Sequence, residues 1–153
     1  MSERPRISLL YQFFVTAQRL RRVLGDAMAE SGMRPDEYAV YSLLFESGPL
    51  TATQMADYLG MPLTTVLDYL KAMAAAGHVV RTAHPFDGRA LEVSLSRSGM
   101  AAHKRAHQHW EVMRKQIEGN LAIPADRIES ALSALQNAAE RTVSARARRS
   151  RTG

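Results

Sequence analysis

Two histidines, His103 and His107, stand four residues apart in a segment whose apolar residues recur with helical spacing. This spacing places both imidazoles on one helix face, where they can bind one metal ion together. A structural zinc site takes about four ligands, and the sequence contains no cysteine that would add thiolates. We therefore interpret the pair as unliganded side chains and predict neither a metal site nor a cofactor.

Other reactive side chains do not form a catalytic pattern. The sequence has no Gly-rich phosphate loop, and its serines, histidines and acids lack the arrangement typical of nucleophilic catalysis. The serines fall instead where helix caps and turns are expected. We predict that the protein is not an enzyme, so the remaining candidates are binding residues.

A patterned set of such residues lies in the segment MPLTTVLDYLKAMAAAG. Helical spacing puts Val66, Leu70 and Met73 on one face, which must pack against the rest of the domain. The opposite face is polar and flanked by two leucines: Thr64, Asp68, Lys71, Leu63 and Leu67. An outward face of this kind is suited to contact a large partner.

Local signals place this helix second in a helix-turn-helix. Thr51 followed by Gln54 fits a capping box that begins a short helix, and Gly60 ends it. Pro62 then begins the second helix at its first position, where the missing N–H has no helical partner anyway. Gly77 ends this second helix.

A hairpin follows the two helices. Residues 79–82 and 91–95 contain β-branched or alternating apolar residues and predict two strands. Between them Pro85 and Asp87-Gly88 favour a turn, through a fixed φ and through tolerance of positive φ, and Arg89 falls at or beside its tip. The order predicts a mainly α protein with a small β-wing. In a winged helix-turn-helix the second helix enters the major groove of DNA and the wing reaches a flanking backbone or minor groove.

The run LTATQMADYLGMPLTTVLDYLKAMAAAGHVVR, followed by a wing that ends LEVSLSRSG, closely resembles the MarR family of bacterial transcriptional regulators. The family's wing motif is Asp-any-Arg, then a strand that ends in Leu-Thr or Leu-Ser. Asp87, Arg89 and Leu95-Ser96 match this motif position by position. The resemblance extends over nearly the whole chain. It implies that Arg89 enters the minor groove, while we interpret Asp87 as an organiser of the wing loop.

The candidate contacts to double-stranded DNA are Thr53, Gln54, Leu63, Thr64, Thr65, Leu67, Asp68, Lys71, Arg81 and Arg89. Asp68 is the unusual member, because an acid repels phosphate and the family often has a basic residue there. Two interpretations of Asp68 stay open. Its carboxylate accepts a hydrogen bond from a cytosine amino group, or it pairs locally with Lys71 or Arg81.

Helices are also predicted on both sides of the winged helix-turn-helix, which spans 33–95. Residues 7–32 and 96–143 carry apolar stripes at three- and four-residue steps, and with 33–95 they form a single unit over 1–143. These stripes need a cover. A homodimer provides one and presents two recognition helices to a palindromic operator. The MarR resemblance implies the same dimerisation helices; the alternative is packing within one chain.

The resemblance further implies a pocket for a small aromatic or phenolic effector. The candidate lining residues are aromatic, with one arginine available for a carboxylate: Tyr11, Phe14, Tyr38, Tyr41, Trp110 and Arg19. The alternative for most of these aromatic residues is ordinary core packing.

Charge is concentrated at the C-terminal end of the chain. The net charge is +5, from 20 basic and 15 acidic residues, but residues 144–153 hold four arginines and no acid. The rest of the chain is therefore almost neutral, and we predict that 144–153 form a disordered basic tail. No signal peptide or membrane-spanning segment is recognised in the sequence, which predicts a cytoplasmic protein.

Two functions remain. The first is a dimeric transcriptional regulator that binds DNA, a repressor released by a small ligand. The second is a winged-helix module that binds proteins and no longer an operator. Arg89, Lys71, Arg81 and the basic tail favour the first, whereas the near-neutral body and the surface of Leu63, Leu67 and Asp68 favour the second.

Overall fold

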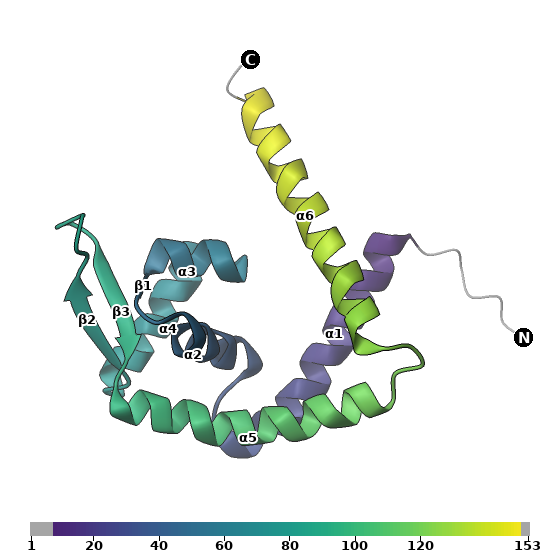
Figure 1. The fold of residues 1–153 in the computed structure, drawn as a ribbon, viewed down its shortest axis with the longest axis horizontal. Helices are drawn as coiled ribbons and strands as arrows, with labels where there is room; N and C mark the ends of the chain where they lie inside the picture. The colour runs from purple at the N-terminus through teal and green to yellow at the C-terminus, as the bar shows by residue number, and fades with distance from the viewer. Residues whose placement is uncertain (1–7, 151–153) are drawn as a thin grey trace, which may run out of the picture. The chain divides into compact units, whose positions relative to one another are not determined.

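The structure is a computed structural model, and it describes residues 8–150 (Figure 1). Its helices are α1 (Leu9–Met28), the short 3-10 helix η1 (Ala29–Ser31), α2 (Pro35–Ser47), α3 (Ala52–Leu59), α4 (Leu63–Ala75), α5 (Arg97–Gly119) and α6 (Ala125–Ser150). Its strands are β1 (Leu50–Thr51), β2 (Val79–Ala83) and β3 (Leu91–Leu95). The fold class predicted from the sequence, a mainly α winged helix-turn-helix with a small sheet, is confirmed.

The chain divides into two compact units inside α5, between Met113 and Arg114. The first unit holds α1 to α4, the sheet and most of α5, and the second holds the end of α5 with α6. The sequence predicted one unit over 1–143. The buried residues of the long α5 all lie between Gly99 and Ala106, so the helix continues past them before the division.

The helix-turn-helix forms for the reasons that its sequence indicates. The Thr51 side chain accepts from the backbone N–H of Gln54, and the Gln54 side chain accepts from that of Thr51 at 2.8 Å, which completes the capping box. Gly60 ends α3 in the left-handed conformation, with φ of 61°. Pro62 was predicted at the first helical position but lies one residue earlier, at the N-cap, because its ψ of 139° is extended.

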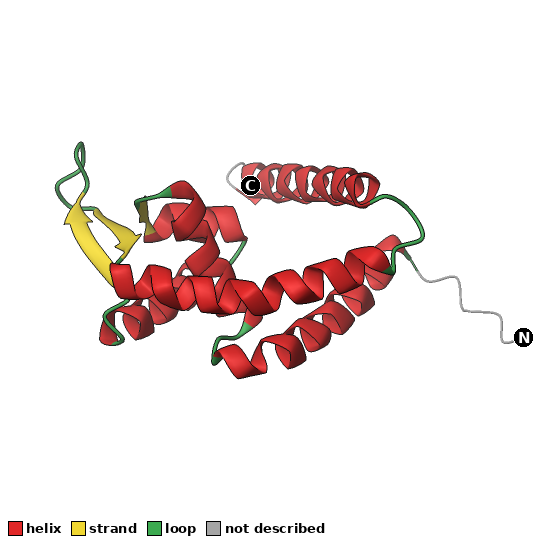
Figure 2. Ribbon diagram, turned by 60° about the horizontal axis from the view of Figure 1, so that its bottom comes forward, coloured by secondary structure: helices red, strands yellow, loops and turns green. Residues whose placement is uncertain are grey.

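The wing is the hairpin of β2 and β3, shown in yellow with its green loop in Figure 2. The two strands are antiparallel, from Val79 opposite Leu95 to Ala83 opposite Leu91. The sequence did not predict β1, which adds only two residues to the other edge of β3 and gives the strand order β1-β3-β2. A strand of two residues is too short to show an alternating pattern.

The core of the first unit lies among the end of α1, α2, α3, α4, β3 and the start of α5. Its largest fully buried side chains are Met28, Val40, Met55, Val66 and Met73. Each such side chain contributes roughly 1.5–3 kcal/mol of hydrophobic stabilisation relative to an exposed one. This core holds the inner face of α4, so the opposite face of that helix is fixed toward solvent.

The C-terminal part of the chain differs from its prediction. Residues from 144 onward were predicted to be disordered, but α6 continues through Ser150. Alanine and arginine are good helix formers, and Arg148 and Arg149 in the last turn interact favourably with the helix dipole. The rest of the predicted tail, 151–153, lies outside the described residues. None of the described helices is long and apolar enough to cross a membrane.

Candidate nucleic-acid interface

The outward face of α4 presents most of the predicted contact residues together. Its inner residues Val66, Leu70 and Met73 are buried, and its outward residues are exposed: Leu63, Thr64, Leu67, Asp68 and Lys71. Thr65 is half-buried, and its backbone N–H donates to the Pro62 carbonyl at the start of the helix. Leu63 and Leu67 keep 42% and 48% of their surface exposed. The helix thus offers two apolar and several polar side chains to one partner.

Asp68 has no ion pair with Lys71 or Arg81 among the residues that the structure describes. Local pairing, one of the two interpretations of this residue, therefore has no support in the structure. Thr53 and Gln54 are exposed at the start of α3, but the side-chain oxygen of Gln54 already accepts a hydrogen bond from the Thr51 backbone N–H. The amide nitrogen of Gln54 remains available for a contact with DNA, and its side-chain oxygen keeps a second lone pair.

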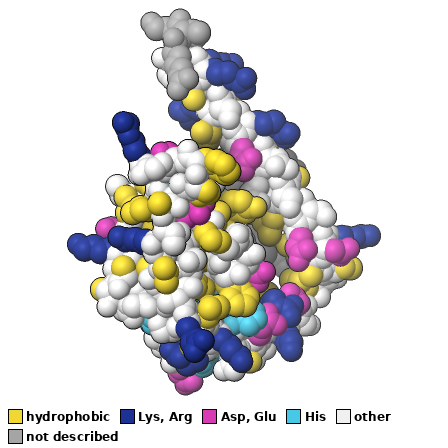
Figure 3. Space-filling model, turned by 60° about the vertical axis from the view of Figure 1, so that its left-hand side comes forward, with side chains coloured by type: hydrophobic (Ala, Val, Ile, Leu, Met, Phe, Trp, Pro, Cys, Tyr) yellow, Lys and Arg dark blue, Asp and Glu magenta, His cyan; other side chains and the backbone are white. Residues whose placement is uncertain are grey.

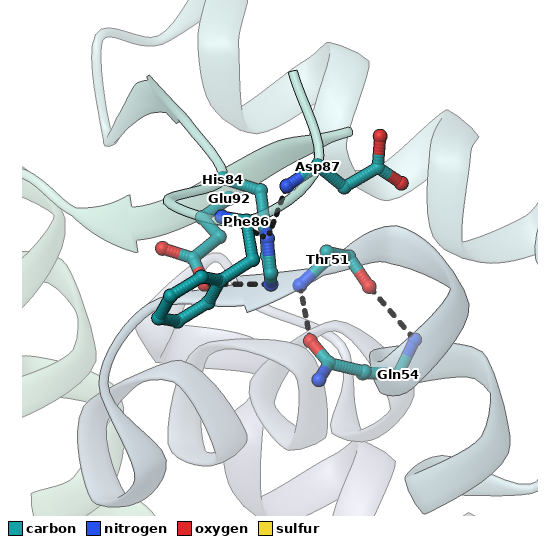
Figure 4. A network of polar contacts seen from close by, with 6 residues as sticks. All are labelled: Thr51, Gln54, His84, Phe86, Asp87 and Glu92. Atoms are coloured by element: carbon teal, nitrogen blue, oxygen red, sulfur yellow. Dashed lines mark hydrogen bonds and ion pairs between the residues drawn. The ribbon is translucent and has the colours of Figure 1, made fainter. Parts of the chain in front are cut away.

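The wing tip is held by the ring of His84. Its Nδ1 accepts hydrogen bonds from the backbone N–H of Phe86 at 3.2 Å and of Asp87 at 3.1 Å (Figure 4). Its Nε2 lies 3.6 Å from the Glu92 carboxylate on β3. The His84 backbone N–H also donates to the Ala90 carbonyl, which closes the loop at its base. Sequence analysis missed His84; a histidine three residues before the Asp-Gly pair is the only signal.

Asp87 and Arg89 lie in this same loop. The Asp87 carboxylate accepts from the Arg89 backbone N–H at 3.0 Å, a contact suited to organising the loop. The turn predicted at Asp87-Gly88 is present, but Gly88 does not use its tolerance of positive φ there. The Asp87 carbonyl accepts from the Ala90 N–H instead, and this turn needs no left-handed residue. Arg89 and Arg81 are both exposed.

The basic groups do not form one continuous field on the face of the molecule drawn in Figure 3. On the face drawn in Figure 3, Lys and Arg side chains are mixed with acidic and hydrophobic ones. This mixture agrees with the almost neutral charge of the chain outside residues 144–153. Attraction to phosphate must therefore come from individual residues such as Arg89 rather than from a general positive potential.

The start of α5 is fastened to the end of α4. The hydroxyls of Ser96 and Ser98 both donate to the Gly77 carbonyl, at 2.7 and 2.9 Å, and the Ser96 N–H donates to the His78 carbonyl. Gly99 packs so closely there that an added Cβ would lie 2.1 Å from the His78 carbonyl oxygen. This junction holds the end of α4 and the start of β2 in position against α5.

The residues predicted to line an effector pocket do not form one set. Tyr38 is buried and stacks on Trp110 at 4.8 Å between ring centroids, and its hydroxyl lies 2.7 Å from Nδ1 of His107. Tyr41 is also buried, and its hydroxyl lies 2.7 Å from Nδ1 of His78. Burial raises the pKa of Tyr41 to about 12, and the charge of Glu37 adds a smaller contribution. The phenol is therefore neutral and able to donate.

The N-terminal members of that set lie elsewhere. Tyr11, Phe14 and Arg19 are exposed on α1, with 53% and 60% of the surface of the two aromatic residues open. The core-packing alternative therefore describes Tyr38 and Tyr41, while Tyr11 and Phe14 belong to an apolar face of α1. That face also includes exposed Leu9, Leu10 and Phe13.

A groove of about 420 Å³ lies between the end of α2 and the first half of α5. It is lined by Phe45, Glu46, Met100, Ala101, His103, Lys104 and His107, none of which was predicted for the effector pocket. Nε2 of the buried His103 lies 3.0 Å from the Ser42 hydroxyl. Burial and the neighbouring His107 lower the pKa of His103, and Glu46 opposes this shift.

His103 and His107 stack with ring centroids 5.6 Å apart, and each has a ring nitrogen beside a hydroxyl of α2. Within residues 8–150, no group of three or more histidine, cysteine or acidic side chains is placed to hold a metal ion. The two rings serve instead to attach α5 to α2.

Comparisons with known proteins agree on the fold. A family model described as the sugar-specific transcriptional regulator TrmB matches residues 28–86, the part from the end of α1 to the wing tip. No curated protein sequence matches the chain.

Several solved structures are similar over most of the chain. A probable transcriptional regulator from Pseudomonas aeruginosa is 23% identical with a TM-score of 0.75, covering 86% of this chain and 99% of that one. The M. tuberculosis transcriptional regulator MosR, in complex with DNA, is 22% identical with a TM-score of 0.77, covering 89% and 98%. MarR from E. coli is 20% identical with a TM-score of 0.69, covering 86% and 97%. The chain thus has the fold of MarR-type regulators, as the sequence resemblance predicted.

Proposed function

We propose that the protein is a dimeric transcriptional regulator that binds double-stranded DNA at a palindromic operator in the cytoplasm. The observation that carries this proposal is the outward face of α4, exposed from Leu63 to Lys71 while the opposite face is locked in the core. A helix held in this way fits the major groove, which is wide enough to admit it. The wing presents Arg89 to a neighbouring groove of the DNA.

The side chains on this face divide by the contacts that they can make. Leu63 and Leu67 offer apolar surface to thymine methyl groups, and Thr64 and Thr65 offer hydroxyls to phosphate or base edges. Asp68, which lacks an ion pair in the described chain, can accept from the amino group of cytosine. Lys71 and Arg81 supply charge for phosphates.

The dimer is supported by uncovered apolar surface. Large hydrophobic residues of α1 remain exposed in the single chain, among them Leu9, Leu10, Phe13 and Phe14, and no residue of α6 is buried. A second copy of the chain would cover these helices. Light scattering coupled to gel filtration tests this at micromolar concentration, where a folded species of 17.0 kDa would contradict the dimer.

DNA binding is tested by selection from a pool of random duplexes, followed by fluorescence anisotropy with the selected sequence. Arg89→Ala should weaken this binding by about 1–3 kcal/mol and leave the melting temperature unchanged, because the side chain is exposed. Arg105→Ala, which removes an exposed arginine from α5, is the matched control and should bind as the wild type does.

The regulator is proposed to act as a repressor that a small aromatic or phenolic ligand releases. One of the similar structures, BpsR from Bordetella bronchiseptica, is described as regulated in DNA binding by 6-hydroxynicotinic acid; it is 16% identical with a TM-score of 0.75. The groove between α2 and α5 has an apolar side with Phe45 and Met100, and it has Lys104 for an acid group. This groove suits such a ligand better than the scattered aromatic set predicted from the sequence.

Benzoate and 6-hydroxynicotinic acid are suitable probes for release of the labelled duplex. Lys104→Ala should reduce the effect of the acid, and Lys115→Ala, an exposed lysine later on α5, is the control. A reporter fused to the selected operator should be more active when the gene is deleted. If the wild type selects no duplex at all, that result favours the alternative function, a module that binds proteins through the surface of Leu63, Leu67 and Asp68.

A further inference from the structure

Phe86 is the most exposed large hydrophobic side chain of the described residues, with 94% of its surface open. It stands at the wing tip, between Pro85 and the Asp87 that organises the loop. Single exposed hydrophobic residues are common on protein surfaces. Phe86 differs from such residues in how firmly its backbone is held.

Hydrogen bonds on both sides of Phe86 hold the loop. The backbone N–H groups of Phe86 and Asp87 both donate to Nδ1 of His84 (Figure 4). The Asp87 carboxylate also accepts from the backbone N–H of Arg89. The rings of His84 and Phe86 meet edge to face at 6.2 Å between centroids. The loop therefore holds the backbone of Phe86 in a defined position before any partner arrives, which lowers the entropy lost on binding.

We propose that Phe86 is an apolar wedge that enters the minor groove beside Arg89 and partly unstacks one base step of the operator. The inference rests on the proposed function, since it assigns a role to the same wing. Proteins that bind the minor groove often combine an arginine, drawn by the negative potential, with a phenylalanine or leucine that inserts at a base step. Here these two residue types stand three positions apart in one loop.

A wedge of this kind gives the wing a second source of sequence preference. Pyrimidine–purine steps are the easiest to unstack, so operators with such a step under the wing are favoured without any hydrogen bond to their bases. His84 acts as a positioning residue, because it contacts the backbone of the tip and not the DNA. Its acceptor nitrogen, rather than its charge, is what holds Phe86 in place.

The test measures binding of the selected duplex by Phe86→Ala at several salt concentrations. Loss of the ring, which the DNA would bury in the complex, should weaken binding about tenfold to a hundredfold. The salt dependence of the dissociation constant should stay that of the wild type, because no phosphate contact is lost, whereas Arg89→Ala should lower it. Leu91→Ala removes a half-exposed apolar side chain from the same hairpin and serves as the control.

A second measurement follows the base step itself. 2-Aminopurine, placed in turn at each step that the wing protects from hydroxyl radicals, should brighten on binding of the wild type and stay dim with Phe86→Ala. His84→Ala should lose part of the brightening, and His84→Asn should restore it, because the asparagine side-chain oxygen can also accept from the N–H two residues on.

The outcomes separate the two proposals. If the wild type selects no duplex, the proposed function fails and the wedge fails with it. If the wild type binds and Arg89→Ala weakens the complex while Phe86→Ala does not, the proposed function is supported and the wedge is wrong. Equal losses in Phe86→Ala and Leu91→Ala, or no change in 2-aminopurine emission, also overturn the wedge.

Discussion

Replacing Gly99 with alanine should damage the junction between α4 and α5. The new Cβ would lie 2.1 Å from the carbonyl oxygen of His78 and 2.9 Å from its carbon, closer than side chains approach a backbone. Either α5 or the turn at Gly77 and His78 has to move by roughly 1 Å to relieve the overlap. That movement stretches the hydrogen bonds from Ser96 and Ser98 to the Gly77 carbonyl.

The magnitude follows from three contributions. Overpacking costs about 1–3 kcal/mol, and one or two weakened hydrogen bonds add about 1–2 kcal/mol. The better helix propensity of alanine returns about 1 kcal/mol. We expect a net loss of about 1–4 kcal/mol; at the middle of this range the melting temperature is lower by roughly 5–10 °C for a chain of this size.

Thermal unfolding followed by circular dichroism measures this change. Gly119→Ala is the matched control, since nothing lies within 4 Å of its added Cβ and its φ is not positive, and it should melt with the wild type or slightly above it. A Gly99→Ala protein that melts at the wild-type temperature would show that the junction is not tightly packed. The same variant should bind the operator more weakly, because α4 ends at the junction.

Two further predictions concern side chains of α4 and α5. Asp68→Asn should weaken binding to the selected duplex by about 1–3 kcal/mol and leave scrambled DNA unaffected, as expected for a base contact; a uniform gain on both duplexes would mean instead that Asp68 faces phosphate. His103 has a lowered pKa in the folded protein, so the unfolded chain binds a proton first as the pH falls below about 6.5. The melting temperature should therefore decrease below that pH, and His103→Gln should lessen the decrease; identical pH profiles would remove His103 as the cause.

Local chemistry made part of this structure predictable. The capping box at Thr51 and Gln54, the left-handed Gly60 and the buried face of α4 depend on residues within one or two turns of each other. Such short-range rules carry over directly from sequence to structure. The pairing of β2 with β3 followed equally well, because a short loop leaves few registers that keep Val93 in the core.

Long-range contacts were not predictable in the same way. The need for glycine at position 99 arises from a backbone 21 residues away, and no local pattern indicates it. His84 gains its role only when the loop folds around its ring. The helical end of α6 was not predicted because its residues give two opposed signals. The charge of the arginines indicates a solvated segment, whereas their helix propensity indicates a helix.

Three hydroxyl groups of α2 each face a histidine ring: Tyr38 with His107, Ser42 with His103, and Tyr41 with His78. Two of these pairs lie one helical turn apart on α2 and also one turn apart on α5. A slide of one helix along the other by about 5.4 Å, one turn, would separate both pairs and leave buried polar groups without partners. The two hydroxyl–histidine pairs therefore oppose a slide of α5 along α2 and fix the register of the two helices.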